Sequence, residues 1–220
     1  LLFPEGGDCG ITITANGVDY TYDYDPGDVW KTNNYTALTT TALWTAPTTA
    51  DPFAAFKTVK DAIRSSTGDE LTIAIMNTYT FNLMAATDAV KNRYLTTNGL
   101  SLGYLTDTEV KAIVEATSGL RIAIYDKQYK DESGTAHSFV PDGYVCLIPA
   151  GNLGNTWYGT TPEEADLQGA SSAEVSIVNT GVAITREIQN HPVNINTFAS
   201  EIVLPSYERM DSVGVLKVIA

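Results

Sequence analysis

Two histidines and two cysteines are the residues of this chain that could most readily supply a base or an activated nucleophile near neutral pH. His137 lies beside Ser138 in a polar stretch, and His191 precedes Pro192 in a predicted turn. Nucleophilic catalysis needs a nucleophile, a base and an orienting group within hydrogen-bond reach, but the sequence contains no G-x-S-x-G motif around a serine. We therefore interpret both histidines as exposed or capping residues.

The cysteines are too few and too far apart to indicate a disulfide scaffold, which is typically short and cysteine-rich. Cys9 lies in a glycine-rich segment and Cys146 lies inside an apolar run. We predict two unpaired thiols in a reducing compartment. A structural or catalytic zinc site would need an H-E-x-x-H motif or paired C-x-x-C motifs, and neither is present.

Paired carboxylates could act as general acid and base in glycoside hydrolysis, which requires two acids about 5–9 Å apart across a sugar. Asp69–Glu70 and Glu163–Glu164 are neighbouring acids, but such pairs arise by chance in a chain with 26 acidic residues. Glu163–Glu164 is more typical of a first helical turn. The aspartates between Asp19 and Asp28 lack EF-hand spacing, so we predict that they are solvated. Gly151–Gly154 lacks the lysine and helix of a phosphate loop. The sequence predicts no catalytic residue, no cofactor site and no metal site.

Residues 140–167, VPDGYVCLIPAGNLGNTWYGTTPEEADL, combine an apolar strand, a Pro-Asp-Gly turn and an aromatic loop. Asn155, Trp157 and Tyr158 lie in this loop, without residues that could serve as catalytic partners. Two interpretations are open: the aromatic rings cover part of the protein's own core, or they lie on a surface that contacts another subunit. On the second interpretation, Asn155, Trp157 and Tyr158 are the candidate subunit-contact residues.

The overall charge argues against several kinds of partner. The 220 residues carry 13 basic and 26 acidic side chains, so the net charge is −13. Nucleic-acid affinity comes mainly from Lys and Arg, so specific DNA binding is not expected. An acidic surface could still lie next to packed DNA without binding it. No run of about 20 apolar residues predicts a membrane span, and no signal peptide is visible.

Hydrophobic periodicity and capping residues predict the main elements. A hairpin with an Asn16-Gly17 turn is expected over residues 11–24. Asp51–Pro52 and the Thr106–Glu109 capping box mark the starts of two helices. A single further helix is predicted over 78–95, with a buried face formed by Tyr79, Leu83, Ala86, Val90 and Tyr94. Apolar runs predict strands covered on both faces, and these runs are 71–76, 120–125 and 144–148.

The other segments are predicted to be extended or β-rich. Residues 31–50 should be irregular and held by aromatic side chains, and 129–140 should form a solvated hairpin. Strands are expected at 182–188, 201–204 and 213–219, the last with alternating apolar residues. Because regular βαβ alternation is absent, the predicted class is α+β with mixed β-sheets and few helices. The opening Leu1-Leu2-Phe3-Pro4, without an initiator methionine, indicates a fragment that lacks an N-terminal part.

Four segments, in this order along the chain, resemble the major capsid protein E family of lambda-type tailed bacteriophages. They are the hairpin ITITANGVDYTYDYDPGDVW, the helix DPFAAFKTVKDAI with the strand LTIAIM, the stretch LRIAIYDKQYKDESGTAHSFVPDGYVCLIPAGNLG, and the ending PSYERMDSVGVLKVIA. Together they span nearly the whole sequence. Their order and spacing, rather than any single catalytic-style motif, carry the resemblance.

The resemblance implies the tailed-phage major capsid fold, with an axial (A) and a peripheral (P) domain. Residues 65–180 would form the axial domain, and residues 1–64 and 181–220 would belong to the peripheral domain. The family's N-terminal arm, extended loop and most of its spine helix would be missing from this chain.

The function that the resemblance implies is structural and not enzymatic. The protein would be a major capsid subunit, from a phage or a prophage, that assembles with other copies into pentamers and hexamers of an icosahedral head around double-stranded DNA, without sequence-specific DNA binding. Scaffold and head-decoration proteins would be further partners, and the protein would occupy the virion after a stage in the host cytoplasm. Two alternatives are a secreted acidic β-rich binding module, suggested by the Thr/Asn-rich segment 31–50, and a hydrolase that uses acidic residues.

Overall fold

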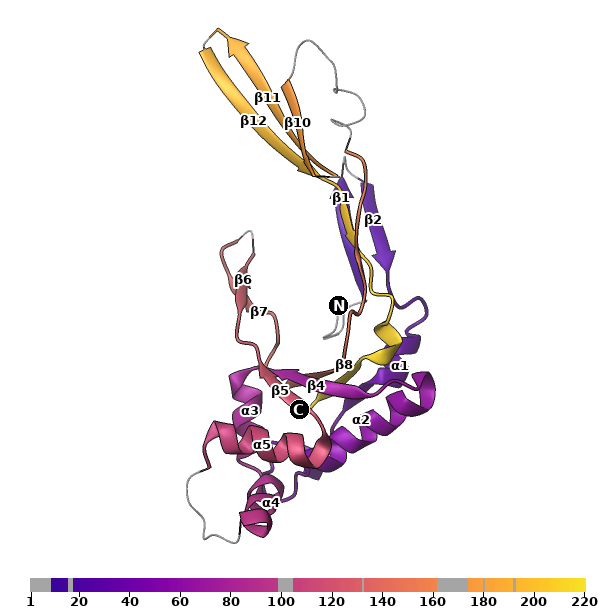
Figure 1. Cartoon of the computed structure of the whole chain (residues 1–220), viewed down its shortest axis with the longest axis vertical. Helices are drawn as coiled ribbons and strands as arrows, with labels where there is room; N and C mark the ends of the chain where they lie inside the picture. The colour runs from indigo at the N-terminus through magenta and orange to yellow at the C-terminus, as the bar shows by residue number, and fades with distance from the viewer. Residues whose placement is uncertain are drawn as a thin grey trace. The chain divides into compact units, whose positions relative to one another are not determined.

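The computed structural model describes residues 9–15, 18–98, 105–131, 133–161, 174–179, 181–191 and 193–220. The chain divides into two compact units (Figure 1). Unit 1 contains residues 1–151 and 209–220, and unit 2 contains residues 152–208. These boundaries differ from the expected limits at 64/65 and 180/181, and the assignment of axial and peripheral domains stays a prediction.

Unit 1 is built around a five-stranded mixed sheet whose order is β3-β14-β8-β4-β5. Two neighbouring pairs, β3–β14 and β4–β5, are parallel, and the other pairs are antiparallel. The strands are β3 (Tyr35–Ala37), β4 (Leu71–Met76), β5 (Arg121–Ile124), β8 (Tyr144–Pro149) and β14 (Gly214–Lys217). The mixed sheet confirms the predicted class.

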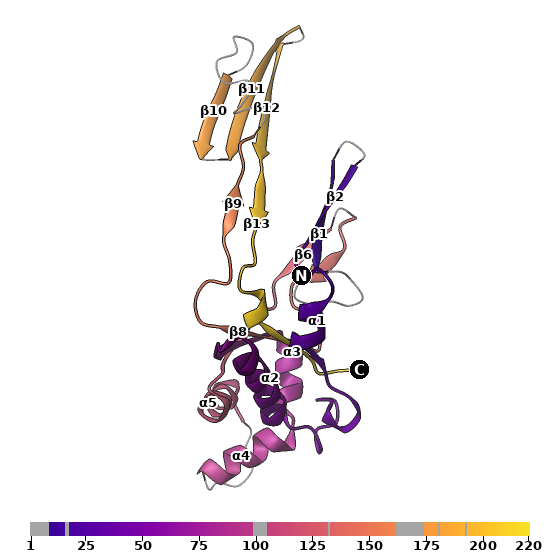
Figure 2. The ribbon, with the colours of Figure 1, turned by 90° about the vertical axis from the view of Figure 1, so that its right-hand side faces the viewer.

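Helices pack on this sheet and form the core with it. They are α1 (Val29–Asn34), α2 (Pro52–Thr67), α3 (Thr78–Ala85), α4 (Asp88–Asn98), α5 (Asp107–Ser118) and the 3-10 turns η1 (Thr40–Ala42) and η2 (Met210–Ser212). The helices α2, α4 and α5 lie on one side of the sheet (Figures 1 and 2). The apolar residues Phe56, Val59 and Ile63 of α2 are fully buried in this core.

The predicted helix starts are confirmed. The Asp51 carboxylate accepts hydrogen bonds from the backbone N–H groups of Phe53 and Ala54 at 3.0 and 3.2 Å. Thr106 and Glu109 form the complete capping box at the start of α5. These caps satisfy donors that a helix leaves unpaired in its first turn, which is why local sequence is enough to predict them.

The single helix predicted over 78–95 is wrong, because the chain breaks between α3 and α4. The Thr87 hydroxyl is buried and donates to the Met84 carbonyl at 2.7 Å, and the Asp88 N–H donates to Pro47 O at 2.9 Å. The break changes the buried face: Tyr79 is exposed, whereas Thr80, Phe81 and Met84 are buried.

Residues 31–50 contain more regular structure than predicted, since α1, β3 and η1 lie in or overlap this range. Trp30 and Trp44 are buried, as the aromatic anchoring predicted. Asp25, predicted to be solvated, is buried, and its carboxylate accepts hydrogen bonds from the N–H groups of Trp30 and Lys31 at 2.8 and 2.9 Å. It therefore caps the start of α1.

The predicted alternation in the last strand is also wrong. Gly214, Val215 and Leu216 are all buried, because β14 lies inside the sheet between β3 and β8 and has the character of a central strand. Gly214 allows α2 to approach closely: a Cβ at this position would lie 2.4 Å from Val59 Cγ1.

We expect Gly214→Ala to lower the free energy of unfolding by about 1–3 kcal/mol, the usual cost of overpacking a core. Urea unfolding followed by circular dichroism measures this change. The control is the double variant Gly214→Ala/Val59→Ala, in which the clashing methyl group is absent. The double variant should lose less free energy of unfolding than the two single variants lose together. A loss equal to that sum would contradict the assigned contact between Gly214 and Val59.

Two hairpins extend from the described part of unit 1. The predicted hairpin over 11–24 is confirmed as β1 (Gly10–Ala15) paired with β2 (Val18–Asp23), and its turn residues lie outside the described residues. The second is β6 (Gln128–Lys130) paired with β7 (Ala136–Ser138), which agrees with the solvated hairpin predicted over 129–140.

Unit 2 consists of a three-stranded antiparallel sheet and a two-stranded ribbon. The sheet contains β10 (Glu174–Asn179), β11 (Val182–Asn190) and β12 (Val193–Glu201), and the ribbon contains β9 (Thr156–Tyr158) and β13 (Val203–Pro205). The strand predicted at 201–204 is split between the end of β12 and β13. Within the described residues of both units, no helix has the length and apolar character needed to cross a membrane.

Candidate functional site

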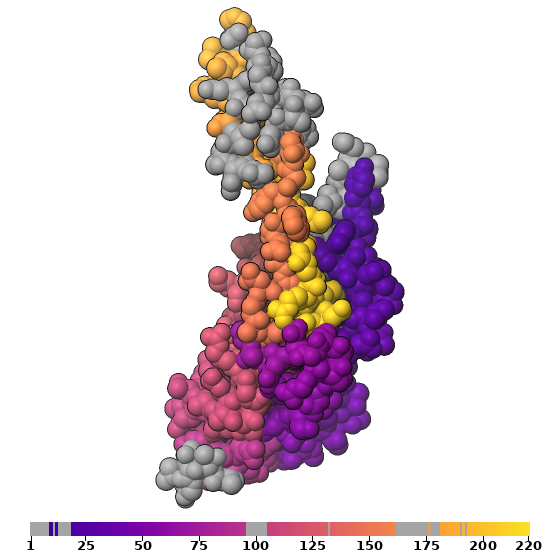
Figure 3. All heavy atoms as spheres, turned by 45° about the vertical axis from the view of Figure 1, so that its right-hand side comes forward, coloured from indigo at the N-terminus to yellow at the C-terminus, as the bar shows by residue number. Residues whose placement is uncertain are grey.

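The candidate aromatic residues lie on the ribbon of unit 2, where β9 and β13 run side by side (Figures 2 and 3). Trp157 pairs with Leu204 and Tyr158 pairs with Val203, so the two rings point to opposite faces of the ribbon. The Trp157 side chain is 61% exposed and that of Tyr158 is 49% exposed. Of the two interpretations, burial in the protein's own core does not describe either ring in this structure.

Asn155 holds the start of the ribbon in place. Its N–H donates to Ser206 Oγ at 3.1 Å, and its carbonyl oxygen accepts from the Ser206 N–H at 2.7 Å. Its side-chain amide donates to both Glu208 carboxylate oxygens at 3.3 Å. A Cβ on Gly154 would lie 2.1 Å from the Ser206 carbonyl oxygen, so only glycine fits there without a backbone shift. Asn155 is thus a positioning residue for the aromatic strand.

A second apolar surface lies on one face of the three-stranded sheet. Ile188 is directly opposite Ile195, and Val193 is opposite Asn190, so the three apolar side chains share a face. Val193 is 84% exposed, and Ile188 and Ile195 are also exposed. The sequence reasoning placed Ile188 in a strand but missed this surface. The alternation in the segment VNIN, residues 193–196, was the signal that could have indicated a strand with one apolar face.

A family model described as phage major capsid protein E matches residues 9–215, which is almost the whole sequence. The chain belongs to the phage major capsid protein E family. The resemblance predicted from the four sequence segments is therefore confirmed. Among curated proteins, no sequence matches the chain.

Solved structures show that this family member has a capsid-protein fold. The putative capsid protein of a prophage from E. coli CFT073 superposes with a TM-score of 0.66 at 18% sequence identity, and the match covers 96% of this chain and 59% of that protein. A phage-related protein from Bordetella bronchiseptica RB50 gives a TM-score of 0.50 at 13% identity, covering 84% of this chain and 55% of that protein. The chain thus spans less than two thirds of the length of either structure.

The two histidines and two cysteines of this capsid family member lie outside the ribbon strands β9 and β13. His137 lies on the exposed hairpin, stacked on Tyr129 with ring centroids 5.4 Å apart. His191 is exposed beside the turn between β11 and β12. Both cysteines are buried and unpaired. Burial raises the pKa of the Cys146 thiol to about 12, so Cys146 is protonated at neutral pH and unreactive.

The acidic pair Asp69–Glu70 has structural partners. The Asp69 carboxylate accepts hydrogen bonds from Ser212 and, at 2.9 Å, from Arg209, and these bonds lower its pKa. Glu70 forms an ion pair with Arg64 at 2.9 Å. A general acid needs the opposite shift, toward a raised pKa. The pair Glu163–Glu164 lies outside the described residues, and within those that are described no group of three His, Cys, Asp or Glu side chains could hold a metal ion.

Asp131 organises the turn of the β6–β7 hairpin. Its carboxylate accepts hydrogen bonds from the Ser133 hydroxyl at 2.6 Å and from the Thr135 N–H at 2.8 Å, and His137 Nε2 lies 2.9 Å away. The Ser133 hydrogen bond, followed by that with His137, lowers the pKa of Asp131 from 3.8 to about 2. Because the folded-state pKa is depressed, the hairpin should be fully stabilised above about pH 4 and should lose this contribution as the pH falls toward 2.

We therefore expect an NMR titration of the Asp131 carboxyl carbon to give a midpoint near 2. Ser133→Ala should shift this midpoint upward, because the variant removes the strongest hydrogen bond to the charged form. A wild-type midpoint at the ordinary value of 3.8 would contradict the assigned hydrogen bonds.

Proposed function

We propose that the protein is a structural subunit without enzymatic activity that assembles with other copies of itself into pentamers and hexamers of an icosahedral phage or prophage head. The match of the family model over residues 9–215 carries this proposal. Closed shells arise when head-to-tail contacts rotate to closure. The head would enclose double-stranded DNA without sequence-specific contacts, and scaffold and decoration proteins would be additional partners. The subunit would pass through the host cytoplasm before it enters the virion.

We further propose that Trp157 and Tyr158 contact a neighbouring subunit and that Asn155 positions them. An isolated two-stranded ribbon is only marginally stable in water, and this one carries a tryptophan and a tyrosine that are both exposed. Large aromatic side chains that become buried at an interface often contribute most of its binding energy. The apolar face formed by Ile188, Val193 and Ile195 supports the same role for unit 2.

The axial and peripheral assignment also stays part of this proposal, with residues 65–180 as axial and residues 1–64 and 181–220 as peripheral. No observation on the described residues favours the alternatives of a secreted binding module or an acid-dependent hydrolase. The pKa of the described acid Asp69 is lowered and not raised, which is unsuited to a general acid.

Assembly of the full-length protein tests the proposed function. We expect negative-stain microscopy to show rings or closed shells, and sedimentation velocity to show a species much larger than the monomer. The assay should cover a range of protein and salt concentrations, both with and without co-expressed neighbouring phage genes. Monodisperse monomers under every one of these conditions would contradict the proposal.

A further inference from the structure

An open groove of about 520 Å³ lies on the helical side of unit 1 and is lined by residues of α2, α4 and the end of α5. Basic side chains gather in it although the chain as a whole is strongly acidic. Those that line it are Lys57, Lys60, Arg64 and Arg93, together with the acids Asp51 and Asp61.

The distribution of charge along the chain sets this helical layer apart. The helices α2, α4 and α5 together contain six basic and five acidic residues. The rest of the sequence therefore holds seven of the 13 basic residues and 21 of the 26 acidic residues. The groove therefore lies in the part of the chain where basic and acidic residues are nearly balanced. The rest of the chain carries an excess of acidic residues.

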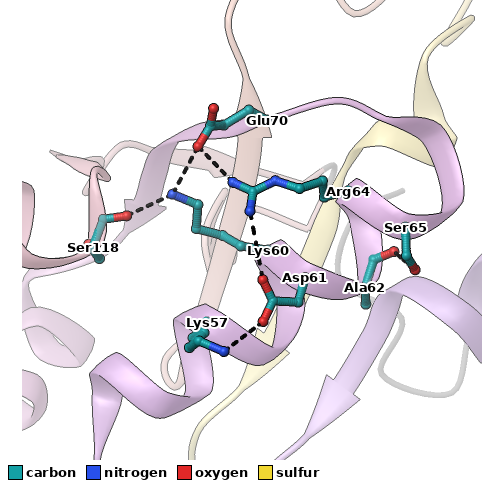
Figure 4. A network of polar contacts seen from close by, with 8 residues as sticks. All are labelled: Lys57, Lys60, Asp61, Ala62, Arg64, Ser65, Glu70 and Ser118. Carbon is teal, nitrogen blue, oxygen red and sulfur yellow. Dashed lines mark hydrogen bonds and ion pairs between the residues drawn. The ribbon is translucent and has the colours of Figure 1, made fainter.

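Two of the four cations hold the groove together (Figure 4). The Lys60 side chain is only 13% exposed, and its ammonium group donates to the Ser118 carbonyl oxygen at 2.7 Å, at the end of α5. Arg64 donates to Glu70 at 2.9 Å, and Lys60 lies 3.6 Å from the same carboxylate. Through Lys60 these contacts tie α2 to α5 and to the residue before β4, whereas the Arg64 side chain is 53% exposed and shares Glu70 with Lys60.

The other two cations, Lys57 and Arg93, have exposed side chains. The Lys57 side chain is 78% exposed, and its ammonium group forms an ion pair with the half-exposed Asp61 carboxylate at 2.9 Å. Exposed ion pairs of this kind contribute little to stability, so Lys57 can exchange Asp61 for another carboxylate at small cost. Arg93 is also exposed, and its guanidinium lies 6.0 Å from the centre of the Phe53 ring.

We infer that this groove receives an acidic segment of a second copy of the chain, with Lys57 and Arg93 as the contacting cations. The inference rests on the proposed assembly function. Copies that each carry a net charge of −13 repel one another, so a shell of such copies needs places where a cation of one meets an anion of the next. Among the described residues, this groove combines accessible cations with a concave surface.

The acids of the groove explain why a protein segment fits better than DNA. Asp51 and Asp61 line the groove beside the cations, and Glu70 lies within ion-pair distance of Lys60 and Arg64. A DNA backbone presents closely spaced phosphates and gains affinity by contacting many cations at once, so it would meet these carboxylates. A peptide with separated Asp or Glu side chains can place each carboxylate next to a cation and avoid the acids.

The test uses zero-length carbodiimide cross-linking, which joins a lysine amine to a carboxylate that is in direct contact with it. Particles of the full-length protein are assembled from an equal mixture of isotope-labelled and unlabelled chains and analysed by mass spectrometry. We expect cross-linked peptides in which Lys57 of one isotope form is joined to Asp or Glu of the other. Lys57→Glu should lower particle yield by about five- to tenfold, since it places a carboxylate opposite a carboxylate.

Lys130→Glu is the matched control, because Lys130 is exposed on the β6–β7 hairpin and its substitution changes the charge equally. This variant should assemble as the wild type does. Replacing the cross-linked acid by lysine in the Lys57→Glu background should restore the yield.

Particles in which Lys57 joins only Asp61 of its own chain overturn the inference while the proposed function stands. Protection of Lys57 from acetylation in DNA-filled but not in empty particles would instead assign the groove to DNA. A wild-type protein that forms no particles overturns both proposals.

Discussion

Phe56→Ala is expected to lower the free energy of unfolding by about 3–5 kcal/mol, the usual cost of deleting a buried aromatic ring. Phe56 is completely buried on the core face of α2. Its ring meets that of Trp44 edge to face, with centroids 5.8 Å apart and an interplanar angle of 89°. Truncation of the Phe56 side chain removes this contact and leaves a cavity between α2 and the sheet. Urea unfolding monitored by far-ultraviolet circular dichroism measures the change.

Phe53→Ala provides the matched control, since it makes the same chemical change one turn earlier on the same helix. The Phe53 side chain is only partly buried and packs at the edge of the core. Its truncation should therefore cost clearly less than that of Phe56. An equal loss for the two variants would mean that α2 does not direct Phe56 into the core as described.

Much of unit 1 could be predicted because its signals are local. The Asp51 cap and the Thr106–Glu109 capping box depend on residues within one helical turn, and both are present in the structure. The run 120–125, also predicted to be covered on both faces, instead contains the edge strand β5, whose Arg121 is exposed. The runs 71–76 and 144–148 form β4 and β8, which lie inside the sheet, and uninterrupted apolar sequence is the signature of such strands. Here local propensity and tertiary packing favour the same structure.

The sequence predictions for unit 1 are wrong where contacts between residues distant in the sequence determine the structure. The break at Thr87 depends on Asp88 donating to the carbonyl of Pro47, about forty residues earlier in the sequence. The central position of β14 depends on pairing with β3 and β8, which the residues of β14 alone do not reveal. Asp25 could be recognised as a cap only after α1 was known to begin at Val29.

The candidate contact residues could be predicted only in part. The sequence left open whether Trp157 and Tyr158 are buried in the core or exposed, and the strand that contains them is only three residues long. Its partner β13 lies more than forty residues later, so the ribbon has no local sequence signal. The positioning role of Asn155 depends on Ser206 and Glu208 across the same ribbon and was not foreseen.

Trp157→Ala is expected to impair assembly strongly while leaving folding nearly intact. The side chain is 61% exposed, and substitutions at exposed positions usually change stability by no more than about 0.5 kcal/mol. A tryptophan at the centre of an interface commonly contributes about 2 kcal/mol or more, which corresponds to a weakening of each contact by about thirtyfold. Because every subunit in a shell repeats the contact, we expect the protein concentration required for assembly to rise at least about tenfold. Light scattering against protein concentration measures this threshold, and urea unfolding measures stability.

Two further variants separate the contact role from the strand. Trp157→Thr removes the aromatic ring and introduces a β-branched residue that favours strand conformation, so it should fold as well as the wild type and still assemble poorly. Tyr79→Ala removes an aromatic ring that is also exposed, but on α3 in unit 1, and it should assemble normally. Normal shells from both Trp157 variants would remove the contact role from the ribbon. Loss of assembly in all three variants would show that exposed aromatic area in general is required, and not the particular surface that Asn155 positions.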